Sequence, residues 1–243
     1  MQRPRTRLRS PSAPDDVTRL LRYGGLVACF ASATVFAADL LLLGGALQPD
    51  QPNVMHIIPT KPDWMVFWGH TLGVLFIPVC LTGMILVWHG LRPAGFWVAT
   101  LITFGLATLF AVGPFIHGMY APIGALIGVR DQLGEPLYTR LMDGHGTYFA
   151  GPLMPTIILL MLASLAFSLL VLMGRTAFPR WLGLWSLGPM MLLFVLSPRY
   201  LPAGLAGIVS PACVHMAYLP FISFVTWWMW NGPPPAHGDE GEA

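Results

Sequence analysis

Charged residues are scarce in this chain: Asp, Glu, Lys and Arg make up only 10% of its 243 residues, whereas 55% are hydrophobic. A soluble domain averages about 25% charged residues, so the composition excludes an ordinary soluble domain. Several apolar runs are long enough to cross a hydrocarbon core, which takes about 20 helical residues. We therefore expect an all-α, polytopic helical bundle that crosses the cell membrane several times.

Motifs for metals, redox chemistry and internal repeats are also missing. The three cysteines, Cys29, Cys80 and Cys213, lie in apolar runs without a CxxC pair, which indicates buried thiols. The seven histidines show no HxxxH, HxxH or CxxCH spacing, so we expect no metal or other cofactor. No repeat is evident either, and the sequence thus shows no sign of a repeat-built transporter.

Six segments are expected to span the bilayer, at about 23–46, 65–90, 94–117, 147–173, 178–197 and 204–230. They form one transmembrane domain over 18–231. The flanking segments 1–17 and 232–243 are polar and proline-rich, which predicts disordered tails. The first span is followed by no A-x-A cleavage site and is expected to be retained.

Arginine positions predict the orientation. Six basic residues lie within the first 22 positions: Arg3, Arg5, Arg7, Arg9, Arg19 and Arg22. Such a cluster also occurs in nucleic-acid binding, but an apolar span follows at once, so we interpret it as a cytoplasmic anchor and expect no nucleic-acid partner. Arg92, Arg175 and Arg180 fall on the same predicted side, against Lys61, Arg130, Arg140 and Arg199 on the other. Both termini are therefore expected in the cytoplasm.

Two predicted outer segments are longer than a minimal turn. Residues 47–64 contain four prolines, and residues 118–146 include a candidate amphipathic helix around 131–142. Two interpretations stay open for them: a lid over an outward-facing cavity, or ordinary connecting loops.

Ionisable residues from five predicted spans gather at one level. Counting about 1.5 Å per helical residue places Asp39, within "VFAADLLLLGG", in the outer half of the membrane. His70, His117, His145 and His215 fall in the same half. An ionisable side chain in hydrocarbon is costly and normally faces the bundle interior, a partner or a wet cavity. A packing hydrogen bond at Asp39 and solvated histidines at the interface are the alternatives to a functional site.

A carboxylic acid in an apolar cavity can stay protonated and act as a general acid. Protonation of an alkene or epoxide by Asp39 would start a carbocation cyclisation, and aromatic faces would stabilise the cation. The candidate catalytic residues are Asp39, His70, His215, His145, His117 and Tyr218, and the candidate substrate-binding residues are Phe67, Phe115, Tyr120, Tyr148 and Phe221. The histidines would orient the acid or remove the final proton.

In its size, its handful of spans, its intramembrane acid ("AADLLLL") and its aromatic residues, the chain resembles the small integral-membrane terpene cyclases of bacteria and fungi. The resemblance implies a membrane enzyme acting on a hydrophobic isoprenoid-type substrate. Fungal members are thought to use paired acids, whereas only Asp39 lies at depth here.

Two other function classes stay open at this point. A haem- or metal-binding redox protein would use the intramembrane histidines, for example His70 with His215 or His145 as axial haem ligands. A small proton-coupled transporter or immunity protein would use Asp39 and the histidines as a proton relay. The expected partners are the lipid bilayer and a hydrophobic small molecule, and the sequence does not indicate an oligomeric state.

Overall fold

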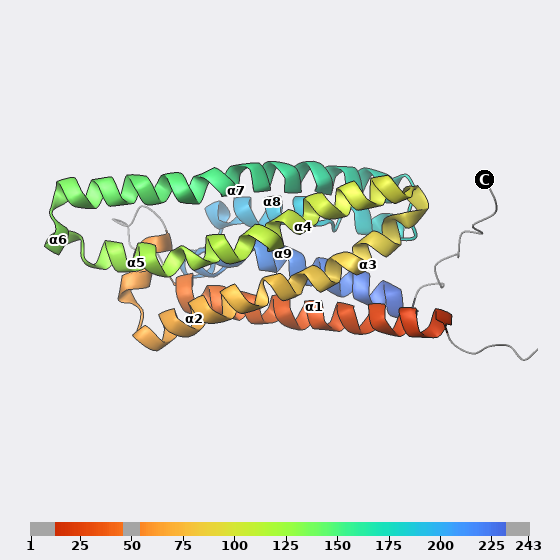
Figure 1. Cartoon of the computed structure of the whole chain (residues 1–243), viewed down its shortest axis with the longest axis horizontal. Helices are drawn as coiled ribbons and strands as arrows, with labels where there is room; N and C mark the ends of the chain where they lie inside the picture. Colours follow the sequence, from red (N-terminus) through yellow and green to blue (C-terminus); the bar gives the residue numbers. More distant parts are fainter. Residues whose placement is uncertain (1–12, 46–53, 232–243) are drawn as a thin grey trace, which may run out of the picture.

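A computed structural model describes residues 13–45 and 54–231 of the chain, and within these ranges it contains helices and connecting turns but no strand. The longest axis of the molecule follows the helices (Figure 1). The helical segments, in chain order, are α1 (Ala13–Leu43), η1 (Val54–Thr60), α2 (Asp63–Phe76), η2 (Pro78–Leu81), α3 (Thr82–Leu91), η3 (Arg92–Ala94), α4 (Phe96–Gly118), α5 (Tyr120–Gly128), α6 (Arg130–Leu133), α7 (Glu135–Leu172), η4 (Arg180–Gly183), α8 (Leu187–Leu196), η5 (Ser197–Tyr200) and α9 (Ala203–Asn231).

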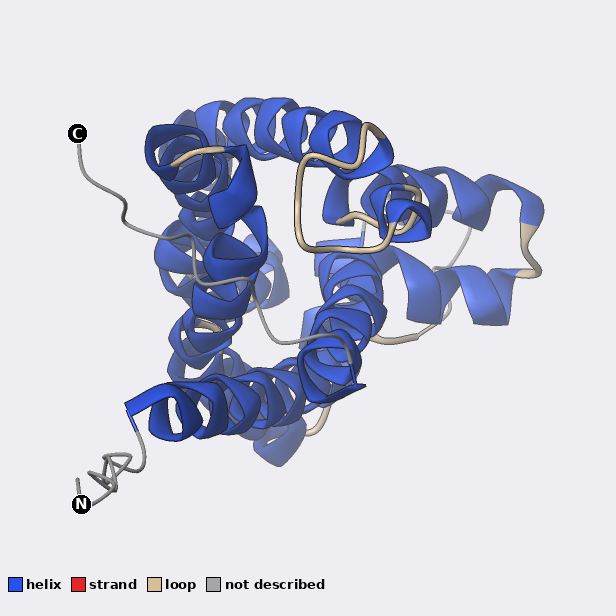
Figure 2. Cartoon of the chain, turned by 90° about the vertical axis from the view of Figure 1, so that its right-hand side faces the viewer, coloured by secondary structure: helices blue, strands red, loops and turns tan. Residues whose placement is uncertain are grey.

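Five helical stretches are long and apolar enough to span a membrane: Val17–Leu43, Asp63–Ala94, Phe96–Gly128, Glu135–Leu172 and Ala212–Asn231. Seen along the bundle, these helices pack side by side (Figure 2). The expected all-α membrane bundle is therefore confirmed. The fifth expected span, at 178–197, contains only the ten-residue helix α8 between the 3-10 turns η4 and η5. At 1.5 Å per residue, α8 covers about 15 Å, half of a typical hydrocarbon core.

The start of α1 and the end of α9 lie at the same end of the bundle. Arg22 donates hydrogen bonds to the carbonyl oxygens of Met229 (3.3 Å) and Trp230 (3.2 Å). Trp228 Nε1 donates to the Ala177 carbonyl at 3.0 Å, which places the α7–η4 turn at this end too. At the opposite end, Lys61 links the turn before α2 to the end of α1, since its ammonium donates to the Gly44 carbonyl.

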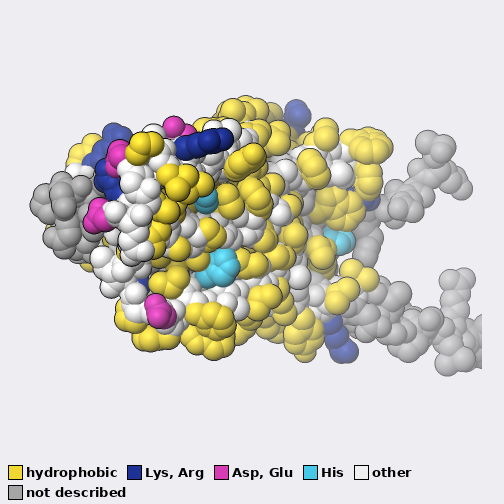
Figure 3. All heavy atoms as spheres, turned by 60° about the vertical axis from the view of Figure 1, so that its left-hand side comes forward, with side chains coloured by type: hydrophobic (Ala, Val, Ile, Leu, Met, Phe, Trp, Pro, Cys, Tyr) yellow, Lys and Arg dark blue, Asp and Glu magenta, His cyan; other side chains and the backbone are white. Residues whose placement is uncertain are grey.

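The surface between the two ends is apolar. On the face drawn in Figure 3, acidic and basic side chains gather at one end, a few further basic side chains lie at the other end, and hydrophobic side chains cover much of the surface between them. Large residues such as Leu101, Leu162 and Leu165 are exposed on the outside of the bundle. Such a wide apolar surface is expected where the solvent is lipid. The interior is filled by a core that includes Phe110, Phe167, Tyr218 and Phe221.

The segment 118–146, expected as an outer connection, is almost entirely helical. α5, α6 and the first turns of α7 form a hairpin that projects beyond α2 and α1 (Figure 1). α7 contains 38 residues, about 57 Å, so it extends well past a hydrocarbon core of about 30 Å. The expected helix at 131–142 is part of α6 and α7, joined at Gly134, whose φ of 74° suits a glycine.

The two expected disordered tails lie at the ends of the chain, where the structure describes only part of the residues. α1 already begins at Ala13, inside the segment 1–17 that was expected to be disordered. Residues 1–12 and the expected tail 232–243 lie outside the described residues.

Candidate functional site: a buried aspartate–histidine pair

Asp39 lies in the penultimate turn of α1, and its partner is His117 in the last turn of α4. The distance between Asp39 Oδ1 and His117 Nδ1 is 3.5 Å. Both residues are buried, with 5% of Asp39 and 3% of His117 exposed. The structure therefore brings together two of the residues that the sequence singled out, although they lie 78 positions apart in the chain.

Two glycines of α2 create the space for this pair. Gly69 and Gly73 are spaced four apart in "GHTLG" and lie on one face of the helix. At Gly69, an added Cβ would lie 2.9 Å from the backbone nitrogen of Leu42 in α1. At Gly73, an added Cβ would overlap the imidazole ring of His117. Small residues at this spacing let membrane helices approach closely, and here they also make room for a side chain.

The other ring nitrogen of His117 defines its tautomer. Nε2 lies 3.0 Å from the Gly69 carbonyl oxygen. A carbonyl only accepts hydrogen bonds, so Nε2 carries a hydrogen and donates it. Nδ1, which faces Asp39, is then either an acceptor or the second N–H of an imidazolium. The pair is electrically neutral only when Asp39 and Nδ1 together hold one proton, and a net charge at this depth would be costly.

Two further predicted histidines surround the pair without bonding to it. His70 lies in α2 between the two glycines, within electrostatic range of His117, and its Nδ1 is buried with no hydrogen-bond partner among the described residues. His215 of α9 lies 3.5 Å from the Ser32 hydroxyl through Nδ1, also within electrostatic range of His117. Asp39, His117 and His215 are thus buried, and His70 is half-buried.

Tyr120 lies beside the aspartate–histidine pair. Its ring packs edge-on against His117, with 5.4 Å between the centroids, and also contacts the ring of Phe149 in α7, with 5.8 Å between the centroids. Tyr120 and Cys213 both lie within electrostatic range of Asp39. Tyr120 therefore connects the aspartate–histidine pair with the projecting hairpin.

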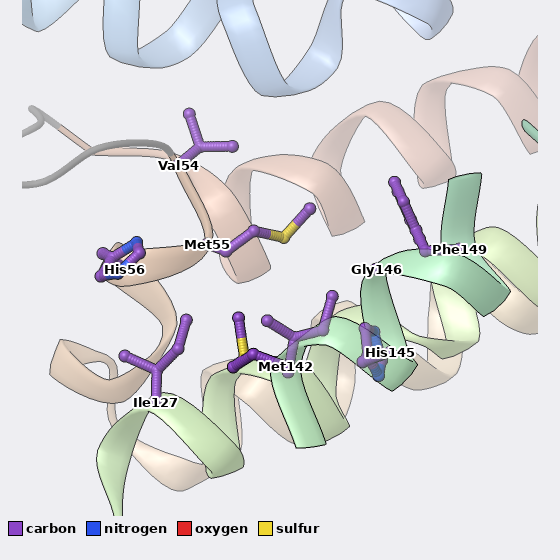
Figure 4. Close-up of a pocket in the computed structure, with 9 residues that line it drawn as sticks. Val54, Met55, His56, Ile127, Met142, His145, Gly146 and Phe149 are labelled. Atoms are coloured by element: carbon purple, nitrogen blue, oxygen red, sulfur yellow. The ribbon is translucent and has the colours of Figure 1, made fainter. Parts of the chain in front are cut away.

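A pocket of about 320 Å³ lies between η1, α5 and α7, at the hairpin (Figure 4). Its lining residues are Val54, Met55, His56, Ile123, Ile127, Met142, His145, Gly146 and Phe149. Its volume falls at the lower end of the about 300–1,000 Å³ typical of small-molecule sites. The two outer segments therefore enclose a pocket together, and the pocket shares Phe149 with the chain of rings that leads to His117.

The remaining predicted residues lie elsewhere. Tyr218 is fully buried, donates to the Cys80 carbonyl at 2.7 Å and packs on Phe110 at 4.3 Å. Phe221 is buried in the core against Phe167.

The other three predicted substrate-binding aromatic residues are exposed on the outside of the molecule: Phe67 (59%), Phe115 (50%) and Tyr148 (70%). The structure does not gather them around Asp39. Their faces point to the surroundings of the bundle, where aromatic side chains anchor a helix in lipid.

Sequence reasoning did not single out Gly69, Gly73 or Ser32. The first two carry a readable signal, the GxxxG spacing within an apolar helix. Ser32 carries none. No group of three or more His, Cys, Asp or Glu side chains that could hold a metal ion occurs in the part of the chain that the structure describes.

The fold defines the chain as a polytopic helical membrane protein with a buried acid–imidazole pair. Comparison of the chain with models of protein families, with curated proteins and with solved structures gives no match.

Proposed function

We propose that the chain is an integral-membrane enzyme that protonates a hydrophobic isoprenoid-type substrate and thereby starts its cyclisation, with Asp39 as the proton donor. The observation that carries the proposal is the buried Asp39–His117 pair, which is neutral when it holds one shared proton. Tyr120 packs on His117 and on Phe149, and Phe149 lines an apolar pocket. A buried acid that holds a proton can act as a general acid in an apolar site.

The proposed reaction needs no co-reactant. Asp39 gives its proton to one carbon of an alkene, or to an epoxide oxygen, and the substrate becomes a carbocation. Ring closure moves the positive charge, and loss of a proton from a neighbouring carbon forms a new double bond. His117 Nδ1 or the Asp39 carboxylate takes up that proton, which returns the pair to its neutral state. Substrate and product are therefore isomers.

Tyr120 is the aromatic residue best placed to stabilise the cation. Its ring lies next to His117 and next to Phe149, which lines the pocket. The face of an aromatic ring attracts a cation through its quadrupole, by about 0.5–2 kcal/mol. Tyr120 thus takes the role that the sequence had assigned to a wider set of aromatic residues.

We further propose that the protein lies in the cell membrane with both termini in the cytoplasm. Arg22, Arg92 and Arg180 lie in segments at the end of the bundle where α1 begins and α9 ends, which supports this orientation by the positive-inside rule. The aspartate–histidine pair and the pocket would then lie towards the outer leaflet.

The test is product formation by the purified full chain in lipid nanodiscs, with farnesyl- and geranylgeranyl-type alcohols and epoxides as substrates. We expect a cyclic isomer, and in D₂O an alkene that is protonated on carbon should give a product with one carbon-bound deuterium, because the donated proton comes from an exchangeable carboxyl group. Asp39→Asn should abolish this product, since the amide has similar size but cannot donate that proton.

Asp63→Asn is the matched control, because Asp63 begins α2 and is exposed to the surroundings. It should leave turnover unchanged. Full activity of Asp39→Asn, or a product of alkene protonation without carbon-bound deuterium, would remove Asp39 as the proton donor.

A further inference from the structure

The pocket between η1, α5 and α7 is lined almost entirely by apolar groups. Val54, Met55, Ile123, Ile127, Met142 and Phe149 provide hydrocarbon, sulfur and ring surface. Gly124 lets α5 approach η1, since an added Cβ there would overlap Ile58. A pocket with this lining gains most from an alkyl or prenyl chain, because burial of apolar surface is favourable without any directed contact.

His145 supplies a directed contact. Its Nε2 is buried and has no hydrogen-bond partner among the described residues. Buried polar atoms are nearly always paired in folded proteins, so an unpaired one in a pocket wall indicates a missing partner. A ring nitrogen can donate to a carbonyl or epoxide oxygen, or accept from a hydroxyl group.

Charged groups are absent from the nine lining residues, which include neither Lys or Arg nor Asp or Glu. Of the basic residues in the segments around the pocket, Arg130 forms an ion pair with Glu135 at 3.1 Å, Lys61 donates to the Gly44 carbonyl, and Arg140 is exposed and does not line the pocket. A diphosphate is normally held by Arg or Lys, or by magnesium on carboxylates. The lining offers no such group for it.

We propose that this pocket binds a prenyl compound with an uncharged oxygen-containing head, a hydroxyl or carbonyl, which His145 holds by a hydrogen bond. The prenyl class rests on the proposed function, whereas the uncharged head is argued from the pocket alone. Phe149 lies between this pocket and Tyr120, so the tail of the ligand points along the rings towards His117 and Asp39.

The test is equilibrium binding of radiolabelled farnesol and farnesyl diphosphate to the purified full chain in nanodiscs, corrected for partition into empty nanodiscs. We expect saturable binding of farnesol, and at least about tenfold weaker binding of the diphosphate, since tenfold corresponds to 1.4 kcal/mol. Equal or tighter binding of the diphosphate would overturn the proposal, as would the absence of saturable farnesol binding.

Two glycines of α7 provide a matched pair of variants. Gly146 lines the pocket and Gly144 does not, and an added Cβ has free space at both. Gly146→Leu should fill the pocket and weaken farnesol binding by about tenfold or more, whereas Gly144→Leu should leave it unchanged. Equal binding by the two variants would place the ligand elsewhere.

A second pair tests the hydrogen bond. His145→Phe keeps a ring but loses both nitrogens and should weaken farnesol binding roughly tenfold, because the buried hydroxyl of the ligand is left unpaired. His145→Gln retains a donor and an acceptor and should restore most of the affinity. Wild-type affinity in His145→Phe would remove His145 from the site.

The pocket and the proposed reaction can fail separately. Saturable farnesol binding that Gly146→Leu abolishes, without any cyclic product, would leave the pocket standing and refute the reaction. Cyclic product that forms equally well in wild type and Gly146→Leu would leave the reaction standing and refute the pocket.

Discussion

Replacing Gly73 by alanine should destabilise the protein, although the same change in most helices stabilises them. Alanine has a higher helix propensity than glycine by about 0.8–1.0 kcal/mol, so an exposed Gly→Ala change is favourable. At Gly73, however, the new methyl group would occupy the place of the His117 ring. The ring must then move, and it leaves the Gly69 carbonyl and Asp39 behind.

The cost follows from the contacts that are lost. A buried polar group left without its partner costs about 1–3 kcal/mol, and breaking a buried charged pair costs about 3–5 kcal/mol in soluble proteins. Hydrogen bonds in membrane bundles are weaker on average, at about 0.6 kcal/mol, because the unfolded state in the membrane also finds partners. We therefore expect a net destabilisation of roughly 1–3 kcal/mol after the gain in propensity.

The assay is thermal unfolding in detergent, followed by circular dichroism, with Gly118→Ala as the control. Gly118 follows His117 directly, and an added Cβ there lies at an ordinary contact distance of 3.9 Å from Val74 Cγ2. A double variant locates the cause: in a His117→Ala background, Gly73→Ala should cost little or nothing, because the ring is gone. A Gly73→Ala protein as stable as wild type would refute the geometry of the pair.

Three further predictions concern residues outside the pair. Tyr218→Phe removes the hydrogen bond to the Cys80 carbonyl but keeps the ring on Phe110, and should lower stability by roughly 1 kcal/mol in a denaturation series. Arg22→Gln loses both the bonds to the end of α9 and the 5.1 Å contact with the Trp230 ring, and should cost about 1 kcal/mol and increase proteolysis there. Burial lowers the pKa of Lys61 below 10.5, so its charged form is disfavoured in the folded state, and stability should rise as the pH rises towards 10.5. Lys61→Met should lack this rise in a comparison of unfolding temperatures across alkaline pH.

The class of fold follows from the sequence because length and hydropathy alone decide whether a helix can cross a bilayer. That Asp39 and His117 lie at one level of the bundle follows in the same way, from a rise of 1.5 Å per residue. What does not follow is the rotation of each helix about its axis. The sequence placed four histidines at the level of Asp39, and the packing of α2 against α1 and α4 selects His117 as its partner.

The exposed aromatic residues show a second limit. In water, a large apolar side chain is expected inside, but lipid is as apolar as the core, so Phe67, Phe115 and Tyr148 lose nothing by facing outward. The extent of the hairpin shows a third limit. Residues 118–146 were expected to contain one short helix around 131–142, yet almost the whole segment is helical. Pro122 and Pro136 lie in the first turns of α5 and α7, where proline is tolerated, and Gly134 separates α6 from α7.

Two walls of the pocket, α5 and the start of α7, are continuous with helices that cross the bundle. Each joins its span near a proline, Pro114 in α4 and Pro152 and Pro155 in α7, where a helix bends most readily. Spans tilt to match the thickness of the bilayer. A change in membrane thickness would therefore change the tilt of both helices, and with it the distance between the two pocket walls. The width of the proposed binding pocket would then depend on the surrounding lipid.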